Sequence, residues 1–246
     1  MQYNAQLSHG QKRRIFLDIG SNIGWFTYLW AAHGIDVIAV EAMEYNINAQ
    51  RKTLYTNPPI ARHVRLYNRL LGSSGQGRRC INFHETVGLP NRGNGQIVSD
   101  NGKQLECHPV AQFAELNAFD RAREQIYAMK IDVEGFEVHV MEGLGLGVAD
   151  LPCYIWIEIV GRKAGTHNFD VVQRGKAGTI RDWLKQQGYK RDLTYTGGGD
   201  HDFVFTRGGE LCATSQTKVK VPLTTDPEPQ CWLLKNLHTP SKCTDR

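Results

Sequence analysis

The sequence predicts an α/β fold in which helices cover both faces of a mostly parallel sheet. Three observations predict it. Apolar runs of strand length alternate with segments whose apolar residues recur at helical spacing. A glycine-rich turn, residues 20–24, joins the first apolar run to the first helical segment, and the second apolar run closes on an acidic residue, Glu41. Strands and helices that alternate in this way form a parallel sheet between two helical layers.

The strands are expected where the apolar runs lie. The run RIFLDI is short and is closed by Gly20, and the run CYIWIEIV is apolar enough to be buried on both faces. The expected strands are Arg14–Ile19, Asp36–Glu41, Val64–Leu71, Ile126–Ile131, Cys153–Val160 and a closing pair, Tyr189–Thr196 and Asp202–Thr206.

The helices are expected between these strands, where residues that stop helices mark several of their ends. Gly34 follows the first helix, Gly188 follows the last, and Pro58-Pro59 follows the second. The expected helices are Gly24–His33, Glu44–Tyr55, Val110–Glu124, Phe136–Gly143 and Thr179–Gln187.

The pattern indicates one domain, over residues 14–208. An N-terminal extension, residues 1–13, precedes it, and a proline-punctuated tail, residues 209–246, follows it. Inside the domain, residues 72–105 are rich in Gly, Ser and Asn and contain short strand fragments, which predicts an inserted loop or hairpin. We expect this insertion to lie on the substrate side of the site.

Composition limits the classes of protein that fit. With 41% hydrophobic and 22% charged residues and a mean hydropathy of −0.42, the chain resembles globular proteins, and no apolar run approaches the ~18–20 residues of a membrane span. No secretory signal is recognised, so a cytoplasmic location is expected. The net charge of +4 requires no anionic partner. The six cysteines are scattered without a C-x-x-C pair, which predicts reduced thiols rather than a zinc site or a disulfide scaffold.

The turn DIGSNIG, residues 18–24, predicts a nucleoside site. Its glycines allow a tight turn and a close approach of ligand, and a carboxylate at the end of the second strand accepts the ribose hydroxyls of a nucleoside. The order G-x-N-x-G differs from the G-x-G-x-x-G of pyrophosphate binders, and an acidic residue two positions before the first glycine would repel a pyrophosphate. S-adenosylmethionine, which has no phosphate, suits this loop. The expected cofactor-binding residues are Asp18, Gly20, Ser21, Asn22, Gly24, Glu41, Ala42, Leu70 and Asp132.

A second acidic group, KIDVEGFE at residues 130–137, follows the fourth strand of the main pattern. Ligands in open α/β sheets bind outside the carboxyl ends of the strands, and three carboxylates so close together are costly unless they are solvated or used. Either Glu134 or Glu137 is expected to cap the following helix. Asp132, at the end of the strand, is expected to face the methyl donor.

Together these motifs resemble the FkbM family of methyltransferases. The resemblance lies in IFLDIGSNIGWFTYLWAAHG, VIAVEAMEYN, MKIDVEGFEVHVMEGL and YIWIEIVG, covers residues 15–207, and departs from the family pattern where Ala42 replaces the usual proline. It implies a class I methyltransferase Rossmann-like fold, seven-stranded with an antiparallel last strand, and O-methylation of a small-molecule or glycan acceptor. By analogy we expect a sugar hydroxyl, within a larger multidomain glycan-assembly protein.

Transfer of a methyl group to a hydroxyl needs in-line placement of the acceptor oxygen and a base for its proton. The candidate catalytic residues are Asp132, Glu134, Glu158 and His201. Asp132 and Glu158, at the ends of neighbouring strands, could also hold a divalent metal such as Mg²⁺, which would acidify the acceptor hydroxyl.

Other acceptors and a non-catalytic role are the alternatives. The acceptor could be another small molecule, or a nucleic-acid or protein nitrogen, and the chain could be a binding module that only holds S-adenosylmethionine. The segment NPPI, residues 57–60, imitates a motif of amino-group methyltransferases but precedes the third strand instead of following the fourth. The basic residues between Arg62 and Arg79 alternate along a strand and a loop, which predicts a solvated face rather than a nucleic-acid site.

Overall fold

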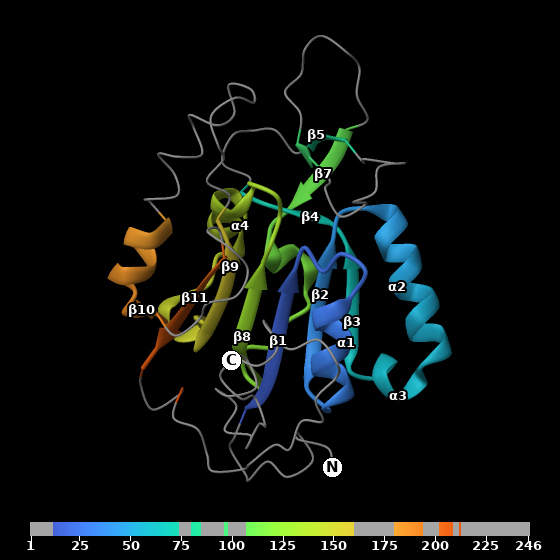
Figure 1. Ribbon diagram of the computed structural model, residues 1–246, viewed down its shortest axis with the longest axis horizontal. Coiled ribbons are helices and arrows are strands. Elements are labelled where there is room, and N and C mark those ends of the chain that lie inside the picture. Colours follow the sequence, from blue (N-terminus) through green and yellow to red (C-terminus); the bar gives the residue numbers. More distant parts are fainter. Residues whose placement is uncertain are drawn as a thin grey trace, which may run out of the picture.

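The computed structural model describes residues 12–73, 80–84, 96–97, 107–159, 180–193, 202–208 and 212; of residues 80–84, 96–97 and 107–109 only the backbone is described. Its centre is a seven-stranded sheet in the order β10-β11-β9-β8-β1-β2-β3 (Figure 1). The strands are β1 (Arg13–Ile19), β2 (Asp36–Glu41), β3 (Val64–Asn68), β8 (Glu124–Ile131), β9 (Tyr154–Glu158), β10 (Tyr189–Arg191) and β11 (Asp202–Arg207).

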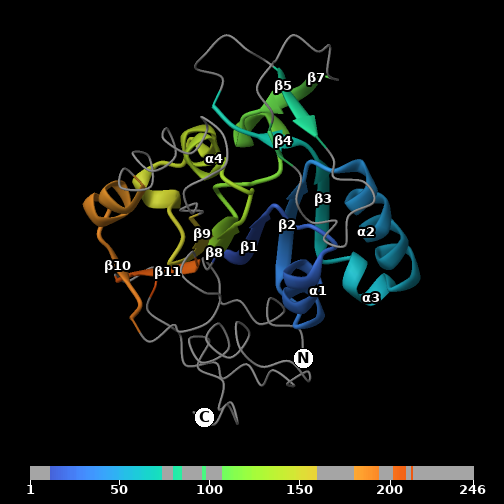
Figure 2. The ribbon, with the colours of Figure 1, turned by 45° about the horizontal axis from the view of Figure 1, so that its top comes forward.

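The sheet is parallel except for its last strand. β11 pairs antiparallel with both β9 and β10, whereas the β1, β2, β3, β8 and β9 ladders are parallel. Helix α1 (Trp25–Ala32) covers one face, and α4 (Glu137–Leu144) with a helix at residues 180–186 covers the other (Figure 2). The predicted class I methyltransferase fold is therefore confirmed.

Each face of the sheet has its own apolar core. On the α1 face, Phe16 stacks on Trp30 with ring centroids 4.6 Å apart, and Val37 packs beside them. On the other face, Ile131 and Ile157 pack with buried side chains of α4 and of residues 180–186. Burial of each such side chain stabilises the fold by about 1.5–3 kcal/mol. Because helices cover both faces of the sheet, the central strands carry apolar side chains on both faces.

Two further helices and a small second sheet complete the described part. Helix α2 (Glu44–Thr56) is followed directly by α3 (Pro58–Ala61), so the predicted stop at the two prolines is correct, although a new short helix begins there. The second sheet, in the order β4-β7-β5-β6, lies beyond the carboxyl end of the main sheet (Figure 1). Its strands are β4 (Leu70–Leu71), β5 (Cys80–His84), β6 (Gln96–Ile97) and β7 (Cys107–Ala111).

This second sheet corrects two predictions. The expected strand Val64–Leu71 is divided, because β3 stays in the main sheet while Leu70 and Leu71 pair with Val110 and Ala111. The expected helix Val110–Glu124 does not form: its first residues belong to β7, a 3₁₀ turn (Phe113–Leu116) follows, and β8 begins at Glu124. The long-range pairing with β4 determines the conformation there, whereas local propensity favours a helix.

The cysteine prediction was also wrong. Cys153, fully buried before β9, forms a disulfide with Cys212, whose Cα lies 5.3 Å away. Disulfides persist in oxidising compartments, so the bond argues against the reduced thiols expected from the sequence.

The amino end of the sheet carries a closed network of ion pairs. Glu124 is buried and accepts hydrogen bonds from Arg13 at 2.7 Å and from Arg65 at 3.1 Å, and Asp36 pairs with Arg13 at 3.1 Å and with His63 at 2.8 Å. Arg65 and His63, expected on a solvated face, are thus partly buried in internal contacts. Among the described helices, none has both the length and the apolar character needed to cross a membrane.

Candidate active site

The turn from β1 to α1 approaches the end of β8 very closely. Gly20 and Gly24 have φ angles of +73° and +91°, which favour glycine, and a Cβ on Gly20 would lie 1.7 Å from the carbonyl oxygen of Asp132. Asn22 is also left-handed, with φ +52°. The turn can therefore follow this path only with glycine at position 20, and this path brings the turn beside Asp132.

Glu41, at the end of β2, holds this turn from the other side. Its Oε2 accepts the backbone N–H of Asn22 at 2.8 Å, and its Oε1 accepts the backbone N–H of Met43 at 2.8 Å. Burial raises the pKa of Glu41, against these hydrogen bonds, which favour its charged form. Glu41 lines a pocket with its carboxylate fixed in place, as a group that receives ribose hydroxyls needs to be.

The pocket lies between the turn after β1, the ends of β2 and β8, and the start of β4. Its polar lining comes mainly from the turn and from three acidic residues, and its apolar lining comes from the β2 and β4 ends. The lining residues are Ile19, Gly20, Asn22, Val40, Glu41, Ala42, Met43, Arg69, Leu70, Leu71, Asp132, Val133 and Glu134.

Beside this pocket, the strand register places chemically active side chains in two rows on the α1 face. The lower row joins Asp18, Lys130 and Trp156 on β1, β8 and β9. The upper row lies two residues further along each strand, where alternate side chains share a face. It consists of Gly20, Asp132, Glu158 and Asp202, the last of which pairs with Glu158 across β9 and β11.

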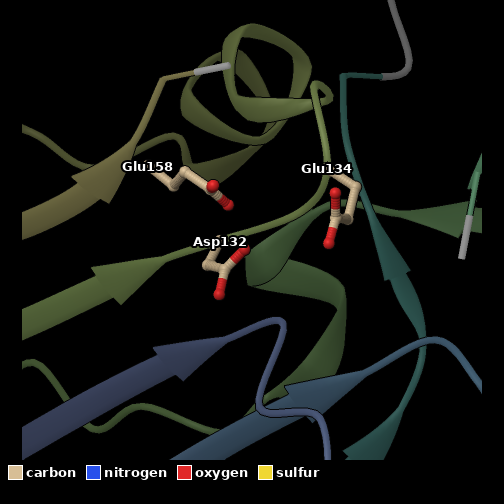
Figure 3. A group of neighbouring side chains, drawn as sticks. All are labelled: Asp132, Glu134 and Glu158. Carbon is tan, nitrogen blue, oxygen red and sulfur yellow. The ribbon is translucent and has the colours of Figure 1, made fainter. Parts of the chain in front are cut away.

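Three carboxylates converge at the end of the upper row. Asp132, Glu134 and Glu158 each offer an oxygen within 4.8 Å of the others, and Figure 3 shows Glu134 facing the other two from the turn after β8. None of the three is fully buried. Carboxylate oxygens in this number and spacing suit either hydrogen bonds from hydroxyls or a hard divalent cation.

The carboxylates of this cluster differ in pKa. Burial, the hydrogen bond with Asp132 and the charges of Asp132, Glu134 and Asp202 raise the pKa of Glu158 to about 9. Burial would also raise the pKa of Asp132, but the Lys130 ammonium and the hydrogen bond with Glu158 keep it below its usual value. The two pKa shifts run in opposite directions, which favours the charged form of Asp132 and the neutral form of Glu158.

The turn after β8 has a conformation that the sequence alone does not predict. Glu134 has φ +53°, which is uncommon for a residue with a side chain, and Gly135 has φ +98°. Glu137 is buried and accepts the backbone N–H of Gly135 at 2.8 Å, and burial raises its pKa to about 7. Glu137 is thus the carboxylate that stabilises the turn, while Glu134 faces the pocket.

The sequence of this chain matches the Methyltransferase FkbM domain over residues 18–191. That is well over half of the chain. The chain belongs to the FkbM methyltransferase family. It is accordingly a S-adenosylmethionine-dependent methyltransferase. No curated protein matches the sequence significantly.

Solved structures similar to this FkbM protein are distant in sequence. Precorrin-6y C5,15-methyltransferase from Geobacter metallireducens has a TM-score of 0.41 and 10% identity over 80% of this chain and 81% of its own. SMU.1697c from Streptococcus mutans, in complex with SAH, has a TM-score of 0.42 and 12% identity over 79% and 88%. Monomeric WbdD has a TM-score of 0.43 and 15% identity over 80% of this chain and 37% of its own.

Most of the expected cofactor-binding residues of this FkbM protein line the pocket. Gly20, Asn22, Glu41, Ala42, Leu70 and Asp132 do so. Three others are placed differently. Asp18 is fully buried and accepts a hydrogen bond from Thr27 at 2.6 Å, Ser21 accepts one from Gln50 at 2.8 Å, and Gly24 is the N-cap residue of α1. Their direct contact with a cofactor stays a prediction, while their positions show that Asp18 and Ser21 support the turn from beneath.

Of the expected catalytic residues, the structure brings Asp132, Glu134 and Glu158 together, and His201 lies outside the described residues. Sequence reasoning missed Lys130 and Asp202 as members of the same cluster. Asp202 follows a glycine-rich stretch of sequence and could have been noticed, but only the β9–β11 register places it opposite Glu158. Lys130 was visible in the KIDVEG string, although no rule of spacing assigns it a role.

Proposed function

We propose that this FkbM protein transfers the methyl group of S-adenosylmethionine to a hydroxyl group, with a sugar or glycan as acceptor. The observation that carries the proposal is the cluster of Asp132, Glu134 and Glu158 at the edge of the pocket, each of which offers a carboxylate oxygen within 4.8 Å of the others. A neutral hydroxyl is a weak nucleophile, and an ionised carboxylate within reach of it can take its proton during attack.

In this reaction the acceptor oxygen attacks the methyl carbon, in line with the carbon–sulfur bond. That bond breaks, its electron pair goes to sulfur to give S-adenosylhomocysteine, and the hydroxyl proton goes to Asp132. Glu158 donates a hydrogen bond that keeps Asp132 oriented. Glu134 accepts a hydrogen bond from a second hydroxyl of the substrate when that substrate is a polyol. A sugar supplies neighbouring hydroxyls to match these carboxylates.

A divalent cation such as Mg²⁺ would be held by Asp132 and Glu158, with Glu134 as the third carboxylate. Bound there, it would lower the pKa of the acceptor hydroxyl and neutralise the cluster. Turnover with EDTA, followed by restoration with Mg²⁺, tests this directly: full activity in EDTA assigns the proton to Asp132 alone.

The first experiment fixes the cofactor. Calorimetric titration with S-adenosylhomocysteine, with NAD as the control ligand, is carried out on the wild type and on Glu41→Ala. Two hydrogen bonds to a carboxylate contribute about 1.5–3 kcal/mol each, so Glu41→Ala should weaken binding at least about 100-fold. Glu44→Ala, an exposed glutamate three residues away, is the matched control and should bind like the wild type. Binding of NAD instead would overturn the cofactor assignment.

The second experiment identifies the acceptor class. Release of S-adenosylhomocysteine is measured with free sugars, nucleotide sugars, glycans, small phenols, RNA and peptides in parallel. Transfer to a sugar hydroxyl, shown by the mass and position of the new methyl group, supports the proposal. Transfer to a nucleic-acid or protein nitrogen would overturn it, and tight cofactor binding without turnover on any acceptor would favour a binding module.

A further inference from the structure

One cation lies at the centre of the acidic rows. Lys130 is only 4% exposed near the carboxyl end of β8, and its ammonium donates to the carbonyl oxygen of Gly20 at 2.7 Å. The same ammonium lies 3.2 Å from Asp132 Oδ2 and 3.9 Å from Asp18 Oδ1. The rings of Phe26 and Trp156 each lie 5.6 Å from it. Burying an ammonium is costly unless it is paired, so these contacts account for its position.

Lys130 is the only described cation in direct contact with either acidic row. The Lys130 side chain belongs to the lower row, and its ammonium reaches the upper row. It therefore links the turn that lines the cofactor pocket to the Asp132 carboxylate at the acceptor side. The Gly20 contact fixes the turn, and the Asp132 contact fixes the orientation of the carboxylate. One side chain therefore contacts both the donor turn and the Asp132 carboxylate.

We propose that Lys130 is the positioning residue of the methyl-transfer site: it holds the Gly20 turn against Asp132 and balances the carboxylates that face the sulfonium. This inference rests on the proposed function, because it takes Asp132 as the group facing the methyl donor. The sulfonium of S-adenosylmethionine is a cation, and the sulfur of the product is neutral. The net charge around Asp132 consequently affects the affinity for S-adenosylmethionine more than the affinity for S-adenosylhomocysteine.

The removal of Lys130 should leave this region more negative. Cationic S-adenosylmethionine should then gain affinity relative to neutral S-adenosylhomocysteine, because an unbalanced carboxylate several ångströms away attracts only the cation. A lysine that merely supported the fold would weaken both ligands by the same factor. The ratio of the two dissociation constants separates these cases, and it requires no knowledge of the acceptor.

The test compares the wild type with Lys130→Met and Lys130→Arg, by calorimetry with both ligands in EDTA so that no divalent ion compensates the carboxylates. Lys130→Met should shift the ratio about tenfold towards S-adenosylmethionine, and Lys130→Arg, which keeps the charge, should restore it to within about twofold. Lys52→Met, on the exposed side of α2, is the matched control and should leave the ratio unchanged.

An unchanged ratio in a folded Lys130→Met protein would overturn the proposal. Where that variant does not fold, the ratio is measured in Asp18→Asn/Lys130→Met, which removes two opposite buried charges together and should show a smaller shift in the same direction, because Asp132 still loses its nearest cation. Failure of the wild type to bind either ligand would contradict the cofactor site itself. Normal binding with an unshifted ratio contradicts only the assignment of Lys130.

Discussion

The two ends of the central sheet use similar residues in opposite ways. At the amino end, the buried carboxylate of Glu124 is matched by two arginines, and Asp36 is matched by Arg13 and His63. At the carboxyl end, Asp132 lies among the carboxylates Glu134, Glu158 and Asp202, and Lys130 is its ion-pair partner in the described part of the chain. A closed network contributes to stability alone. Carboxylates brought close together are costly to the fold, and such a group is kept where a ligand can use it.

The largest effect is expected from the carboxyl end. Asp132→Asn keeps the shape of the side chain but removes the group that accepts the acceptor's proton, so turnover should fall about 10²- to 10⁴-fold. Binding of S-adenosylhomocysteine should stay within about threefold of wild type, as calorimetry would show. Asp182→Asn, on the exposed side of the helix at residues 180–186, serves as the control. Equal loss of binding and turnover would remove the catalytic role from Asp132.

At the amino end, the same kind of change should act on stability instead. Glu124→Gln leaves Arg13 and Arg65 without their shared carboxylate, which should lower the free energy of unfolding by about 3 kcal/mol. Urea denaturation measures the loss, and Glu115→Gln, an exposed residue, provides the reference. Cofactor affinity should not change. If it fell as well, the two ends of the sheet would not be independent.

The smallest effect concerns pH. The pKa of Glu158, about 9 in the folded protein, exceeds its ordinary value of 4.5, so over pH 7–9 the unfolded chain has lost a proton that the folded chain still holds. Unfolding therefore becomes more favourable as pH rises through this window. Wild-type melting temperature should fall from pH 7 to pH 9, whereas Glu158→Gln should have a flatter curve and be more stable at pH 9 by about 1 kcal/mol. Parallel curves would show that Glu158 is ionised at neutral pH.

The sequence allowed a correct prediction of the fold because the signals were local. A glycine must occupy the turn at Gly20, a carboxylate must close β2 at Glu41, and apolar runs mark the buried strands; each is visible within a few residues. The prediction failed where a segment's conformation is determined by partners that are distant in sequence. Val110 pairs with Leu70 in a strand, although its own neighbours favour a helix.

The candidate site could likewise be predicted where its residues are close in sequence, and not where strand pairing brings distant residues together. The acidic string after β8 marked Asp132, but Glu158 and Asp202 meet it only through strand register. Glu134 faces the pocket and Glu137 stabilises the turn because the backbone of Glu134 is left-handed. The amino-acid sequence does not reveal that conformation. Lys130 was not assigned a role because a lysine in a strand is ordinarily solvent-exposed. Its burial arises from the rings of Phe26 and Trp156 and from the carbonyl oxygen of Gly20.

The bond between Cys153 and Cys212 has a practical consequence for anyone who cuts this protein. A single proteolytic nick between β9 and β11 leaves both fragments covalently joined, with β9 on one and β11 on the other still paired through their ladder. Such a nicked molecule would run as one band without reducing agent and as two bands with it. Gel electrophoresis under both conditions would thus report whether the bond is present in the purified protein.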